Sequence, residues 1–288
     1  MKLFFVNVQM LPVKNDAQEL GVEGYFDLLK LLYKEYNDGE LGILRYEKYI
    51  EFYSIDDKTS DNFCKGQLRI CKKAKPYKDK ETHKVTAIPS KNDVQDDPKI
   101  GYFFFDLENH IMAVQKIPNE IISGKTLETK IRALFQKRIN ATNQYKDYYL
   151  DIVVLTQMSE LEKILDEDRV SYLNVNLSFP NSEQTQDQLL EELKKERSGI
   201  EYKEKAFPDS EMRGISSLGK RLALYATKYG NVTMKYFDKS KNKLTKFILR
   251  DQPIESNIKN PEDEHLFTDV FMREEVKNAL DQAWKQKE

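Results

Sequence analysis

Residues 99–117 read KIGYFFFDLENHIMAVQKI and contain two apolar runs on either side of the polar LENH. This pattern is typical of two strands joined by a short turn, so it predicts an antiparallel β-hairpin. Far upstream, KLFFVNVQM at 2–10 is apolar and rich in residues that favour strands. It predicts a strand buried on both faces, which would pack in the same half of the molecule as the hairpin.

Between and after these segments, the first half alternates helical and strand patterns. We expect a helix at 17–39, strands at 41–55 and 62–73, a lysine-rich excursion at 73–99 with three prolines, and a helix at 123–140. Either Ser123 or Thr126 is suited to cap that last helix.

From about residue 145 the pattern becomes a β-α-β-α-β-α-β-β-α series. We expect strands at 148–158, 170–180 and 200–207, helices at 159–169, 181–199, 216–230 and 268–284, and a hairpin at 231–251. Ser159 is the predicted N-cap of its helix, with Glu162 at the capping-box position. The predicted fold class is α+β, in two domains that each hold a mostly antiparallel or mixed sheet with packed helices. The predicted domains span 1–144 and 145–288.

The composition suits a cytoplasmic globular protein. The chain has 288 residues, 40% of them hydrophobic, which is enough for two cores of ordinary size. Its two cysteines, Cys64 and Cys71, fall an odd number of positions apart, on opposite faces of a strand, so we expect no disulfide and a reducing compartment. The N-terminal segment lacks the features of a signal peptide, and no run of about 18 apolar residues predicts a membrane span.

Charge is segregated along the chain, although the whole chain carries only −2. Residues 213–250 hold ten basic residues against Asp238, a net +9, whereas 151–212 carry −8 (15 acidic, 7 basic) and 251–288 carry −5 (10 acidic, 5 basic). We call 213–250 the basic block, and its cations are Arg213, Lys220, Arg221, Lys228, Lys235, Lys239, Lys241, Lys243, Lys246 and Arg250.

No motif predicts a catalytic residue, a metal site or a bound cofactor. GISSLG at 214–219 lacks the second glycine of a nucleophile elbow, so Ser216 or Ser217 is interpreted as a helix N-cap. The sequence contains no glycine-rich phosphate loop and no HExxH or CxxC spacing.

One enzymatic alternative stays open. Glu201 and Lys203 alternate on a predicted strand, with Asp168 and Asp187 upstream. Acid pairs and a lysine around a cation are the groups that a metal-dependent nuclease uses to activate water. The same charges also suit an exposed strand edge, where they prevent unwanted pairing.

The basic block admits two binding interpretations. Its lysines and the aromatics among them, Tyr229, Tyr236 and Phe237, could contact a nucleic acid through phosphates and bases. Alternatively, the lysines dock on the acidic helices of the same chain, on a second protomer or on a partner protein, or they cover a solvated face of the hairpin.

Four segments carry a family resemblance: IGYFFFDLENHIMAVQKIP, TLETKIRALFQ, RVSYLNVNLSFPNSEQTQDQLLEELKK and LGKRLALYATKYGNVTMKYFDKSKNKLTKF. Their order, over about 100–285, resembles the lambda-type Rex phage-exclusion DNA-binding proteins and related proteins of bacterial defence loci. The resemblance implies a cytoplasmic antiphage protein that forms homo-oligomers and binds DNA without sequence preference.

Together these features predict a non-catalytic binding component of a phage-exclusion or abortive-infection system, contacting DNA through the basic block. The alternatives are an interaction or oligomerisation module that binds a second defence protein, and a metal-dependent nuclease.

Overall fold

The computed structural model contains an eight-stranded and a four-stranded sheet, together with a two-stranded ladder. It describes residues 1–13, 20–37, 42–43, 48–55, 62–72, 77–78, 80–82, 85–87, 98–165, 170–178, 192–193, 199–205, 215–258 and 269–283. All strand pairs among them are antiparallel. This confirms the α+β class with mostly antiparallel sheets.

The larger sheet gathers strands from the two ends of the chain. Its members are β1 (Lys2–Pro12), β2 (Gly42–Ile43), β3 (Lys48–Ile55), β4 (Phe63–Lys72), β7 (Lys99–Asp106), β8 (Ile111–Gln115), β9 (Tyr148–Val154) and β14 (Glu255–Asn257). Their order is β14-β1-β8-β7-β4-β3-β2, and β9 also pairs with β1. The predicted hairpin at 99–117 is therefore confirmed as β7 and β8, and it lies at the centre of this sheet.

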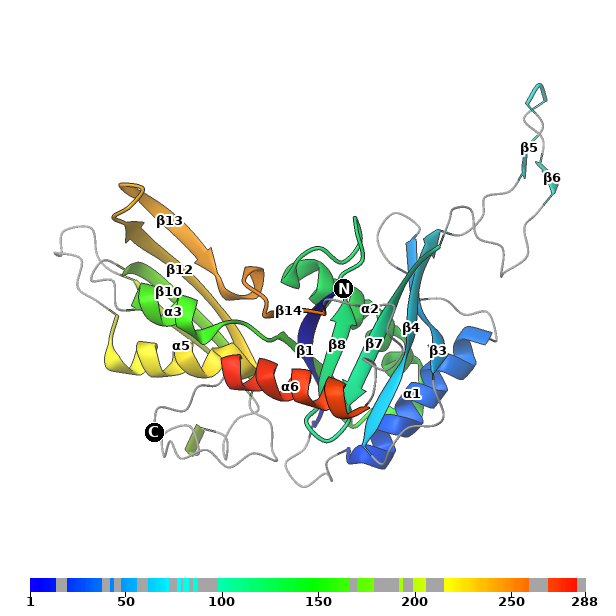
Figure 1. Cartoon of the computed structure of the whole chain (residues 1–288), viewed down its shortest axis with the longest axis horizontal. Helices are drawn as coiled ribbons and strands as arrows, with labels where there is room; N and C mark the ends of the chain where they lie inside the picture. The colour runs from blue at the N-terminus through cyan, green and yellow to red at the C-terminus, as the bar shows by residue number, and fades with distance from the viewer. Residues whose placement is uncertain are drawn as a thin grey trace.

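Helices cover both faces of the larger sheet (Figure 1). Helices α1 (Val22–Asn37) and α2 (Gly124–Ala141) pack on one face, and α6 (Asp269–Ala283) packs on the other. Every residue of β1 after Lys2 is buried, as its apolar sequence predicts. Phe4 faces the α1–α2 side and Phe5 faces α6, so this central strand contributes to two cores.

Local sequence explains how α2 begins. The Ser123 side chain accepts a hydrogen bond from the Thr126 backbone N–H, while the Thr126 hydroxyl accepts from the Ser123 N–H at 2.9 Å. Both predicted caps thus take part in one reciprocal capping box.

The smaller sheet has the order β11-β10-β12-β13. Its strands are β10 (Val170–Ser178), β11 (Gly199–Lys205), β12 (Gly230–Asp238) and β13 (Lys243–Ile248), and its helices are α3 (Met158–Leu165) and α5 (Ser217–Tyr229). Both helices pack on the same side, where they share one core with the inward residues of β10 and β12. The predicted strands, the hairpin at 231–251 and the helix ending at Gly230 are confirmed.

Three predictions differ from the structure or fall on residues that it does not describe. Helix α3 begins at Met158, so Ser159 is inside the helix and is not its N-cap. Gly199 belongs to strand β11 rather than ending a helix, and the helix predicted at 181–199 lies almost wholly outside the described residues. Within the excursion at 73–99, the described residues form a ladder of β5 (Tyr77–Lys78) and β6 (Val85–Ala87).

The two sheets do not divide the chain at residue 145. Strands β9 and β14 pair with β1, and α6 packs on the larger sheet, although all three follow residue 145. The smaller sheet is thus inserted between strands of the larger one. None of the described helices combines the length and apolar character that a transmembrane span requires.

Candidate functional site: the open face of the smaller sheet

The smaller sheet exposes the face that points away from α3 and α5. In the register, Leu173 of β10 lies opposite Met234 of β12, and both are buried in the core with α5. Because side chains alternate along a strand, the neighbouring residues point the other way. We call this other side the outer face, and it carries Glu201, Lys203, Lys205, Tyr172, Asn174, Asn176, Asn231, Thr233, Lys235, Phe237, Leu244, Lys246 and Ile248.

Three lysines and a tyrosine form one row across all four strands. Lys205 lies opposite Tyr172, Tyr172 opposite Lys235, and Lys235 opposite Lys246. We call these four residues the lysine row. Its lysines are exposed, and within the described parts of the chain no hydrogen bond or ion pair engages their ammonium groups. Lys235 and Lys246 lie on neighbouring strands, which are about 4.8 Å apart, and Lys205 lies on the other side of Tyr172. Three such cations on one face favour an anionic ligand.

The next row is polar. Lys203 forms an ion pair with Glu201 at 2.9 Å, and the Asn174 amide donates to the same Glu201 oxygen at 3.4 Å. The hydrogen bond with Glu201 raises the pKa of Lys203, and the same contact lowers the pKa of Glu201. The amide oxygen of Asn174 is buried and has no hydrogen-bond partner in the structure as described.

This pairing bears on the nuclease alternative. Glu201 and Lys203 are about half exposed and face each other on one strand. The further acids of that hypothesis, Asp168 and Asp187, lie outside the described residues. Over the described part of the chain, no three His, Cys, Asp or Glu side chains gather in a way that could hold a metal ion.

The structure distributes the basic block over several surfaces. Lys235 and Lys246 lie on the outer face, and Lys243 lies opposite Asp238 on the other face of the hairpin. Lys239 and Lys241 are in the turn, Lys220, Arg221 and Lys228 are on α5, Arg250 is in η3 (Leu249–Asp251), and Arg213 lies outside the described residues.

Arg250 faces the larger sheet. One of its guanidinium nitrogens lies 3.4 Å from Glu128 of α2. The backbone segments at Gly124 and Arg250 approach closely here, since a methyl group on Gly124 would collide with the backbone oxygen of Arg250. This arginine therefore contributes to the junction between the sheets rather than to the outer face.

Asp238 organises the turn of the hairpin. Its carboxylate accepts hydrogen bonds from the Ser240 N–H at 3.0 Å and the Ser240 hydroxyl at 2.6 Å, and it pairs with the Lys241 ammonium at 3.0 Å. The hydrogen bonds from Ser240, followed by those from Lys241, lower the pKa of Asp238 to about 2. The single acid of the basic block thus fixes the turn between β12 and β13.

Ser216 caps helix α5, which confirms the N-cap interpretation of GISSLG. Its hydroxyl accepts from the Gly219 N–H at 3.0 Å and donates to the Glu204 carboxylate. Tyr202 donates to the same carboxylate. The hydroxyls of Ser216 and Tyr202 and the Glu204 carboxylate therefore hydrogen-bond to one another where α5 begins.

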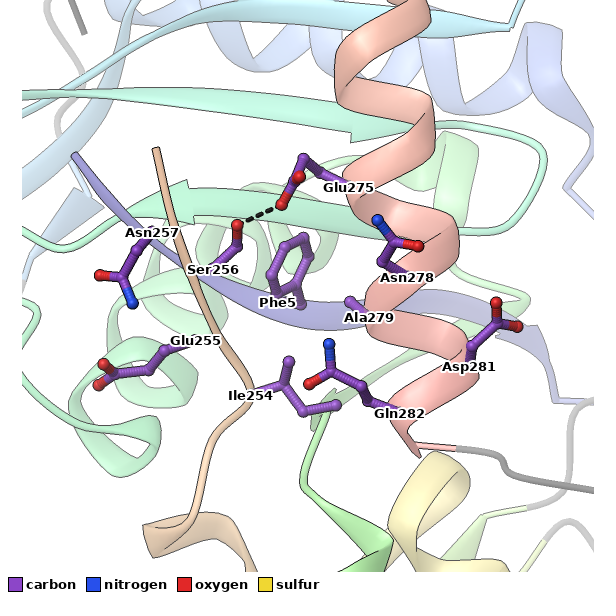
Figure 2. Close-up of a pocket in the computed structure, with 10 residues that line it drawn as sticks. All are labelled: Phe5, Ile254, Glu255, Ser256, Asn257, Glu275, Asn278, Ala279, Asp281 and Gln282. Carbon is purple, nitrogen blue, oxygen red and sulfur yellow. Dashed lines mark hydrogen bonds between the residues drawn. The ribbon is translucent and has the colours of Figure 1, made fainter. Parts of the chain in front are cut away.

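A hollow of about 480 Å³ lies between β14 and α6 (Figure 2). Phe5, Ile254 and Ala279 supply its apolar lining, and carboxylates and amides surround them, with Ser256 donating to the Glu275 carboxylate. Glu255 is already paired with Lys2 and Lys116. The residues that line this hollow include no histidine to activate Ser256 and no cation to attract an anion.

A family model for a domain of unknown function, DUF4747, matches residues 4–273. The chain belongs to this family. The match runs from β1 into α6, so both sheets of this DUF4747 protein lie within the span that defines the family. Among curated proteins, none matches the chain.

Sequence reasoning about the basic block missed Lys205 and Tyr172. The alternation in IEYKEK, which places Glu201, Lys203 and Lys205 on one face of a strand, is the pattern from which this face can be found. The strand partners in this DUF4747 protein are distant in the sequence: Lys205 of β11 lies opposite Tyr172 of the earlier strand β10, and Tyr172 lies opposite Lys235 of the later strand β12.

Proposed function

We propose that this protein binds nucleic acid through the outer face of its smaller sheet, without catalysis of its own. The lysine row is the observation that carries this proposal. Each lysine that contacts a phosphate releases condensed counterions, which gives affinity that is independent of sequence and sensitive to salt.

The net charge of −2 does not oppose this function, because the charge is unevenly distributed. At an ionic strength near 0.15 M, charges are screened beyond about 8 Å, so a ligand on the outer face responds mainly to the lysines beneath it. Acidic residues elsewhere on the surface would discourage binding at other faces.

The broader setting remains a proposal as well. We propose that the two sheets are separate domains, with the smaller one inserted into the larger, and that the protein acts in the cytoplasm as a homo-oligomeric component of an antiphage system. The Rex-type resemblance supports the setting, and the separate cores of the two sheets support the division.

Lys246 and Lys243 provide a matched test. Both are exposed lysines on β13, three positions apart, so their side chains leave opposite faces of the strand. We expect Lys246→Glu to weaken binding of a fluorescein-labelled oligonucleotide by about ten-fold at 50 mM salt, because one phosphate contact is replaced by repulsion. Lys243→Glu, with the same charge change, should stay within about two-fold of wild type. Fluorescence anisotropy measures both.

Equal effects of the two substitutions would contradict the assignment of the outer face. A protein interface is the second candidate, because Leu244 is 54% exposed beside Phe237 at one end of this face. If no oligonucleotide binds and Leu244→Asp dissociates an oligomer in sedimentation, the outer face is an interface between proteins.

A further inference from the structure

An aromatic ring interrupts the lysine row. Tyr172 is half-buried on β10, an inner strand of the sheet, and it is flanked by Lys205 on one side and Lys235 on the other. Phosphate binding needs no aromatic residue, whereas a base can stack on one with a gain of about 1–3 kcal/mol. The ring is placed where a ligand held by these lysines would meet it.

The width of the outer face bears on the kind of nucleic acid it accepts. Four strands at about 4.8 Å spacing span about 14 Å before side chains are added. The major groove of a duplex is about 12 Å wide and admits a helix or a two-stranded ribbon. A four-stranded face therefore reaches only the phosphates of a duplex, and its ring cannot touch a base that is stacked inside the helix.

Hydrogen-bonding groups lie in the row beside the ring. Asn174 and Thr233 are opposite each other and directly follow the lysine row on the same face. The Asn174 amide nitrogen donates to Glu201 over a long contact of 3.4 Å, whereas the Asn174 oxygen is buried and has no hydrogen-bond partner in the described structure. Unpaired bases expose edges that such amide and hydroxyl groups can bind.

We infer that the outer face selects single-stranded nucleic acid over duplex, with a base stacked on Tyr172 and phosphates on the neighbouring lysines. This inference rests on the proposed function and specifies its ligand. Lys205, Lys235 and Lys246 hold the backbone, while Tyr172 discriminates between paired and unpaired bases. Sequence preference should be weak, because every base offers a face for stacking.

The test compares a labelled single strand of about twelve nucleotides with the same strand annealed to its complement, by anisotropy at 50 mM salt. The wild-type protein should bind the single strand more tightly. Tyr172→Ala should weaken single-strand binding roughly ten-fold and change duplex binding by less than about two-fold. Tyr172→Phe is the matched control, because it keeps the ring and should keep the affinity.

The outcomes separate this inference from the proposed function. If Tyr172→Ala leaves single-strand binding unchanged, or the duplex binds as tightly as the single strand, while Lys246→Glu still weakens binding, then single-strand selection is wrong and nucleic-acid binding stands. If neither oligonucleotide binds the wild-type protein, both proposals are wrong. Circular dichroism of each variant confirms that an altered affinity does not come from unfolding.

Discussion

The two sheets differ in how many of their faces are covered. Helices pack on both faces of the larger sheet, and its strand β1 is buried over ten consecutive residues. The described helices of the smaller sheet pack on only one of its faces, and its strand β11 alternates between exposed and half-buried residues. Two covered faces commit nearly every side chain to packing, whereas one open face leaves alternate residues available to a ligand.

The largest effect expected from this comparison is on stability. Phe5→Ala, in the covered sheet, should lower the free energy of unfolding by about 3–5 kcal/mol, because the site is fully buried and the lost ring leaves a cavity. Tyr172→Ala, on the open face, should lower it by less than about 1 kcal/mol. Urea denaturation followed by circular dichroism measures both changes, and similar losses would mean that the outer face is part of a core.

A smaller effect tests how strongly the sheets are coupled. Arg250 and Glu128 join them through a partly exposed ion pair at 3.4 Å. A double-mutant cycle with Arg250→Ala and Glu128→Ala should give a coupling energy below about 1 kcal/mol, as is usual for such pairs. A coupling above about 2 kcal/mol would argue against two separate domains.

Local patterns in the sequence predicted most of the fold. The apolar runs around LENH, the alternation at 170–178 and the serine before α5 each depend on neighbours only a few residues away. Such patterns fix strands, turns and caps directly. They do not fix which strands pair. For that reason the sequence could not predict that β14 and α6 pack with the larger sheet.

The candidate site was predictable only in part. Lys235 and Lys246 belong to the basic block, but a run of charge in the sequence carries no information on which face each residue takes in the folded chain. Arg250 turned toward Glu128, and Lys243 toward the opposite face from Lys246. Tyr172 and Lys205 come from an acidic part of the sequence, and only strand pairing brings them beside the lysines.

Lysine footprinting tests the central claim most directly. The protein is acetylated with a limiting amine-reactive ester, with and without a saturating single-stranded oligonucleotide, and modification at each lysine is quantified by mass spectrometry. We predict protection of Lys205, Lys235 and Lys246, which share the outer face, and no change at Lys243 on the opposite face of the hairpin. Protection of Lys243 with full reactivity at Lys235 and Lys246 would contradict the account.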